Sequence, residues 1–214
     1  MKILQQGHMD GFCLLYAVAN AFKALTCPTQ TASRFVEEQR NVWRKLVSVT
    51  PSLHNFASGK GSCFSTSTEQ RFLELCAAAI SNRSKESFSV HRITKIEEIS
   101  ESVTENSVVV LALGKEARTK RCTMGDHWIC IVDTEDKEFL IACSYTDYLD
   151  NKNGNKKKED DQKKTSGESP CYNRPFNNRI TKKELSKKAI GRSLYKFRYE
   201  ANIRVSGDRE SCKP

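Results

Sequence analysis

The middle of the chain changes from the periodicity of helices to that of strands, and this change sets the fold class. Residues 107–113 (SVVVLAL) are a β-branched apolar run of strand length. Two further apolar runs, 128–133 and 138–145, are separated by the polar residues 134–137. Two such runs joined by a short polar segment predict a β-hairpin. Residues 196–205 alternate between apolar and polar side chains, as in a strand with one buried face. We therefore expect an antiparallel sheet in the second half of the chain.

The first half of the chain has the periodicity of helices. Residues 14–25 are apolar nearly all round, which predicts a helix buried inside the domain, with Asp10 as a candidate N-cap. Residues 31–47 carry apolar side chains at helical spacing, and Pro51 ends this pattern. These segments predict a buried helix followed by an amphipathic one.

Sequence signals for helix starts predict two more helices. A capping box places a Ser or Thr three residues before a Glu or Gln. The candidate pairs are Thr66 with Glu69 or Ser67 with Gln70, and Thr94 with Glu97. Helices followed by an antiparallel sheet define an α+β domain.

Length and charge predict one domain with a charged insertion. We expect a single domain over residues 1–214. Residues 150–170 alternate blocks of lysine and acid with almost no apolar residue, which predicts a disordered insertion. Residues 1–149 carry 17 Lys and Arg against 17 Asp and Glu, so the remaining 65 residues carry 18 against 9. The basic excess thus belongs to the C-terminal segment, 171–214, which we expect to complete the sheet.

Cysteine usage and hydropathy predict a cytoplasmic protein that does not span a membrane. The nine cysteines are an odd number and include no C-x-x-C pair, so neither a disulfide framework nor a zinc ribbon is indicated. Cys76 and Cys130 lie within apolar patterns and are expected to be core residues. No run of about 18 apolar residues is present, and the first residues do not have the pattern of a signal peptide. No metal or cofactor is predicted.

Cys13 stands at the front edge of the predicted buried helix. One interpretation is a small core residue, since free cysteine is among the most buried side chains. The other is a nucleophile, because the positive end of a helix favours the thiolate and lowers its pKa. His127 opens the hairpin in GDHWICIVD and is the best-placed base, since a strand can aim the ring. The other histidines, expected in loops or an edge strand, are His8, His54 and His91.

The motifs around these two residues resemble a known superfamily. A glutamine, then D-G-F-C opening a long apolar helix, then much later G-D-H-W before a hairpin is similar to the papain-like cysteine peptidases. The compact bacteriocin-processing and Josephin-type members are the nearest in pattern, over roughly residues 3–148. The resemblance implies an α+β fold in which N-terminal helices, with the nucleophile at the start of a buried helix, pack on a C-terminal antiparallel sheet. It also implies Gln6 as an oxyanion-hole donor, with Gln5 as the alternate.

The third member of the family's triad has no direct counterpart. The family pattern places Asn or Asp about 15 to 20 residues after the histidine, where it orients the imidazole. Asp147, 20 residues after His127, is the first choice for this role, and Ser144 or a backbone carbonyl is the second. A working Cys–His dyad is the remaining alternative. The positions 15 to 17 residues after His127 are Ala142, Cys143 and Ser144.

Two classes of function follow. The first is a thiol hydrolase that cleaves a peptide or isopeptide bond in a protein or peptide substrate through an acyl-thioester, and the same chemistry serves deamidases and acyltransferases. The second is a non-catalytic protein whose basic residues 171–214 bind nucleic acid or an acidic partner. Around Tyr195, Phe197 and Tyr199, this segment mixes aromatic and basic residues as a single-strand binder does.

Overall fold

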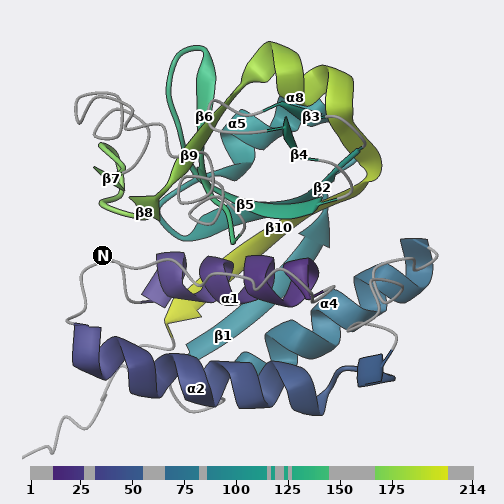
Figure 1. The fold of residues 1–214 in the computed structure, drawn as a ribbon, viewed down its shortest axis with the longest axis vertical. Coiled ribbons are helices and arrows are strands. Elements are labelled where there is room, and N and C mark those ends of the chain that lie inside the picture. The colour runs from purple at the N-terminus through teal and green to yellow at the C-terminus, as the bar shows by residue number, and fades with distance from the viewer. Residues whose placement is uncertain are drawn as a thin grey trace, which may run out of the picture.

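An antiparallel sheet of six strands forms the centre of the molecule (Figure 1). The computed structural model describes residues 12–26, 32–54, 66–81, 86–114, 117–118, 123–124, 127–144 and 167–201. The strand order is β1–β10–β2–β5–β6–β9. The strands are β1 (Glu86–Arg92), β2 (Ser107–Leu113), β5 (His127–Thr134), β6 (Glu138–Ala142), β9 (Asn178–Thr181) and β10 (Ala189–Ala201). The predicted α+β class and the hairpin of β5 and β6 are confirmed.

Three helices cover one face of the sheet (Figure 1). They are α1 (Cys13–Thr26), α2 (Ala32–Ser48) and α4 (Thr66–Ile80), all close to their predicted ranges. Helix α1 lies between the sheet and α2, which explains why its sequence is apolar nearly all round. None of the helices in the described part of the chain is long and apolar enough to cross a membrane.

Shorter elements cover the other face. They are the 3₁₀ turn η1 (Ile96–Glu98), α5 (Ile99–Ser102) and α8 (Lys182–Lys188). Ile99 and Leu185 pack there in a second buried cluster with Ile129, Ile131 and Cys143. The predicted capping box at Thr94 is wrong, because the N-cap of η1 is Lys95, which makes no side-chain cap bond.

Two pairs of short strands lie outside the main sheet. β3 (Ala117–Arg118) pairs with β4 (Thr123–Met124), and β7 (Gly167–Glu168) pairs with β8 (Pro175–Phe176). Residues 150–166 of the predicted insertion lie outside the described residues. Its last four residues are placed, and Ser169 is buried and accepts a bond from the Arg174 N–H.

Strand β10 occupies an interior position, between β1 and β2. It begins earlier than predicted, at Ala189, and residues 202–205 of the predicted strand lie outside the described residues. Tyr195 and Phe197 point into the core beneath the helices and are fully buried. These two rings are not available to stack on nucleic-acid bases, which leaves only the half-buried Tyr199 of the three aromatic residues named in the single-strand-binder interpretation.

A buried arginine joins one end of α1 to the sheet. Arg174 is 1% exposed. Its guanidinium donates to five backbone carbonyls, with Nε bonded to Ala24 (3.2 Å), Nη1 to Ser107 (3.1 Å) and Val132 (3.0 Å), and Nη2 to Thr104 (2.7 Å) and Glu105. The last turn of α1 therefore lies beside the start of β2 and the end of β5.

Candidate functional site

The structure places Cys13 and His127 at the same end of the sheet. Helix α1 packs along β5 and its neighbour β2, and Arg174 joins Ala24 of α1 to Val132 of β5. From Ala24 back to Cys13 the helix spans about 16 Å. From Val132 back to His127 the strand spans about 17 Å. Because α1 packs along β5 and both lead back from the Arg174 contact over equal lengths, Cys13 and His127 lie at the same end of the sheet.

Cys13 occupies the first turn of α1. The first helical bond runs from the Tyr16 N–H to the Phe12 carbonyl at 3.0 Å, so Cys13 is the first residue inside the helix. No acidic residue lies in this turn, and the positive end of the helix is therefore not offset by a carboxylate of α1 itself. The side chain is 6% exposed and packs in the cluster on the helical face of the sheet.

His127 is held on β5 with a thiol against its ring. The imidazole is 7% exposed, and its Nε2 lies 3.5 Å from Cys143 Sγ. Burial lowers the pKa of His127 to about 4. At neutral pH the ring is therefore neutral and can accept a proton, as a general base must.

A bulge in the hairpin decides which side chain meets this ring. Next to the turn, Asp133 pairs with Leu140. Farther from the turn, beyond the bulge, Ile131 pairs with Ile141, so the pairing register has shifted by one residue. Because side chains alternate along a strand, one extra residue moves the following side chains to the other face. The shift puts Cys143 on the face that His127 shares with Ile129.

The other predicted site residues are placed only in part. Gln5, Gln6, Asp147 and His8 lie outside the described residues. Ser144 follows Cys143 in the turn after β6 and is 3% exposed. His54 and His91 are exposed, and His91 lies on β1, an edge strand of the sheet, as predicted.

Asn177 is a contributor to this site that the sequence reading missed. Its side-chain Nδ2 donates to the Cys143 carbonyl at 2.7 Å, and its Oδ1 accepts from the Cys143 N–H at 2.8 Å. Its own backbone N–H donates to the Ile141 carbonyl at 3.1 Å. The amide thus fixes the end of β6 from a position 34 residues further along the chain.

A buried carboxylate lies on the helical face of the sheet near the site. Glu69, in the first turn of α4, is 3% exposed and accepts bonds from Tyr195 Oη at 2.7 Å and Ser193 Oγ at 3.1 Å. Burial and this carboxylate raise the pKa of Tyr195, so the phenol stays a donor. The Tyr195 ring stacks on Trp128, the residue after His127, with centroids 6.5 Å apart. These hydrogen bonds join α4 to β10.

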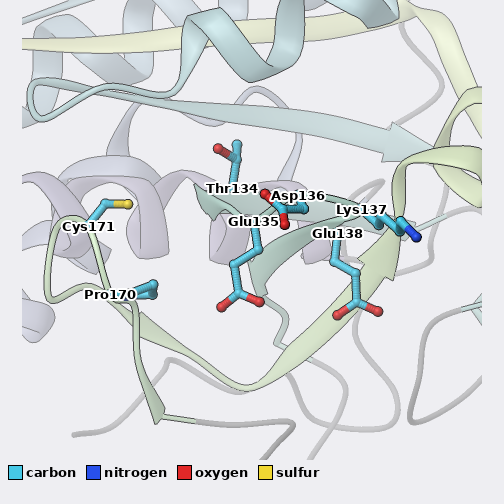
Figure 2. Close-up of a pocket in the computed structure, with 7 residues that line it drawn as sticks. All are labelled: Thr134, Glu135, Asp136, Lys137, Glu138, Pro170 and Cys171. Carbon is cyan, nitrogen blue, oxygen red and sulfur yellow. The ribbon is translucent and has the colours of Figure 1, made fainter.

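An open hollow at the β5–β6 turn, away from Cys13 and His127, does not have the chemistry of an active site. It has a volume of about 600 Å³ and is formed by the β5–β6 turn and residues 170–171 (Figure 2). Glu135 and Glu138 point the same way from the turn, and Cys171 lies across from it. The carboxylate of Asp133, above all, raises the pKa of the Cys171 thiol, so this exposed cysteine is not an activated nucleophile.

Comparisons with known proteins give no precedent for this site. No family model matches the chain, and neither a curated protein nor a solved structure matches it. The functional assignment therefore depends on the residues themselves, and the papain-like resemblance stays a prediction from the motifs around Cys13 and His127.

His127 is expected to make the protein less stable in acid. Its folded-state pKa of about 4 lies below its ordinary value of 6.5, so the unfolded chain binds the proton first as the pH falls. Stability is then lost between pH 6.5 and pH 4, by about 3 kcal/mol in total. Urea unfolding at pH 7 and pH 4.5 measures this loss, and His127→Gln should remove that part of it.

The exposed His91 provides the matched control for this measurement. His91→Gln should keep the pH dependence of the wild type, because its ring lies at the surface beside Ser89 Oγ. If stability depended on pH equally in the wild type and in His127→Gln, the acid sensitivity would not come from His127.

Proposed function

We propose that the protein is a cysteine-nucleophile hydrolase that cleaves a peptide or isopeptide bond in a protein or peptide substrate. Cys13 is the nucleophile, and His127 is first the general base and then the general acid. The observation that supports this most directly is the shared end of α1 and β5, where Cys13 is the first residue of the helix and His127 the first residue of the strand.

The proposed reaction uses the two ring nitrogens of His127 differently. Nε2 is engaged by Cys143, so Nδ1 accepts the proton of the Cys13 thiol across the end of the sheet. The Cys13 sulfur then bonds to the substrate carbonyl carbon, and Gln6, with Gln5 as the alternate, donates to the resulting oxyanion. His127 returns the proton to the leaving amine as the C–N bond breaks, and an acyl-thioester remains. Water attacks this thioester in a second cycle of the same proton transfers.

The geometry supports an acyl-thioester intermediate more directly than a particular acceptor. Water as the acceptor gives a hydrolase or deamidase, and an amine gives an acyltransferase. None of these steps needs a metal or an organic cofactor. The identity of the products from an acylated enzyme distinguishes the three.

Selective alkylation of Cys13 tests the proposal. Iodoacetamide at pH 7, followed by peptide mass mapping, is expected to modify Cys13 at least about tenfold faster than Cys171. Cys171 is the built-in comparison, because it is exposed and its thiol pKa is raised, whereas Cys13 is nearly buried at the start of a helix. Exposure alone would favour Cys171. If Cys13 reacts only after unfolding, it is a core residue and the proposal fails.

A further inference from the structure

The thiol of Cys143 lies where a group that orients His127 would be needed. Cys143 Sγ is 3.5 Å from His127 Nε2. Cys143 is fully buried in the second cluster, on the face of the sheet away from α1, together with Ile129 and Ile141. Because no part of this residue is exposed, a substrate carbonyl cannot approach its sulfur in the folded protein. Its contact with the ring is therefore one of support and not of nucleophilic attack.

The chemistry of a thiol makes this support depend on the ring's tautomer. A neutral imidazole carries its proton on one nitrogen, and a thiol can either donate or accept a hydrogen bond. For Nδ1 to take the proton of Cys13, Nε2 must already carry one. Cys143 Sγ then acts as the acceptor, and the Nε2–H···S contact holds the ring in the tautomer that catalysis requires.

The backbone that carries this sulfur is held by Asn177. The two bonds from the Asn177 amide hold both the N–H and the carbonyl of Cys143, immediately after β6 ends at Ala142. Asn177 is 5% exposed, and its backbone bond to Ile141 attaches it to the same strand. With the backbone held on both sides of its Cα, the Cβ of Cys143 keeps its place, and moving it away from the ring would break buried hydrogen bonds.

We propose that Cys143, held by the side chain of Asn177, is the positioning residue of His127, in the role that the sequence suggested for Asp147 or Ser144. This inference rests on the proposed function, because a tautomer matters only if the ring transfers protons. The orienting group is then a thiol, which is a weak hydrogen-bond acceptor, and not a carboxylate.

The test combines ring spectroscopy with the alkylation rate of Cys13. Nitrogen NMR of the full-length protein with labelled histidine reports the His127 tautomer without any turnover. In Cys143→Ala we expect a shift of the His127 nitrogen signals toward a mixture of tautomers and a fall of about tenfold in Cys13 alkylation at pH 7. Cys143→Ser keeps an acceptor at the same place and should restore both values to within about threefold of the wild type.

Two further variants separate positioning from packing. Cys130→Ala removes an equally buried thiol from the helical face of the sheet and should leave the His127 signals unchanged. Asn177→Ala should shift them in the same direction as Cys143→Ala. Unchanged His127 signals in Cys143→Ala would overturn the positioning role. Failure of the wild-type protein to alkylate at Cys13 would instead overturn the proposed function, and a shifted ring spectrum would then still show that Cys143 sets the tautomer.

Discussion

Replacing Arg174 with methionine is expected to lower the free energy of unfolding by about 3 to 5 kcal/mol. The guanidinium donates to five backbone carbonyls that come from α1, β5 and the segment leading into β2. Methionine fills a similar volume but donates no hydrogen bond, so several buried carbonyls lose their partner. Each buried acceptor left without a partner costs about 1 to 3 kcal/mol, less what relaxation and water recover.

The buried charge of Arg174 strengthens this expectation. Asp133, whose side chain is 1% exposed, supplies a nearby negative charge and is held by the N–H groups of Thr134 and Cys171. Removing the arginine leaves this carboxylate buried without its cation, which adds to the loss of stability.

Urea unfolding at pH 7 measures the effect, and Arg198→Met is the matched control. Arg198 lies on β10 with its side chain 54% exposed, paired with Glu200 at 3.2 Å. Exposed ion pairs contribute about 0 to 1 kcal/mol, so the control should change stability little. Equal losses in the two variants would mean that the Arg174 hydrogen bonds do not hold α1 to the sheet.

The sequence predicted those parts of the fold that local periodicity determines. Strand β2 has the predicted bounds because Ser107–Leu113 combines three consecutive valines with further apolar residues and is buried on both faces of the sheet. Helix α2 ends near the predicted position before Pro51, where proline cannot continue the helical bonds. Local signals of this kind act within a few residues, and they survive in the folded structure.

Contacts made across long distances in sequence could not be predicted in the same way. Arg174 binds main-chain carbonyls, which are present at every residue and leave no pattern to recognise. Glu69 was assigned to a capping box from its spacing, whereas the fold brings Ser193 and Tyr195 to it from over 120 residues away. In both cases the partner is set by how the helices pack on the sheet.

The candidate site shows the same division. Cys13 and His127 could be selected because each lies at the start of a regular element with a recognisable pattern. The contact with Cys143 depends on the bulge between Ile131 and Asp133. A regular ladder continued from the turn would have directed Ser144 to that face instead, and one irregular residue in the strand has no clear sequence signal.

Replacing Cys13 with alanine is expected to lower kcat/KM on an activated peptide ester by at least about 10³-fold, because the proposed acyl-thioester forms on the Cys13 sulfur. The wild-type protein should also accumulate an acyl adduct on Cys13 that mass spectrometry detects. Cys130→Ala, which removes a buried thiol outside the site, is the control and should keep the wild-type rate. Undiminished activity of Cys13→Ala would exclude Cys13 as the nucleophile, whereas a wild-type protein without activity or acyl adduct would favour the non-catalytic interaction protein.

The pH dependence of the same reaction examines the partner of Cys13. Only the unprotonated imidazole can accept the thiol proton, and burial holds the pKa of His127 at about 4. The acid side of the kcat/KM profile should therefore fall with a midpoint near pH 4 and not near the ordinary value of 6.5. His127→Gln should lower the rate by about 10² to 10⁴-fold and remove this limb, because glutamine neither titrates nor transfers a proton. An acid limb that persists unchanged in His127→Gln would mean that another group accepts the thiol proton. The proposed pairing of Cys13 with His127 would then be wrong.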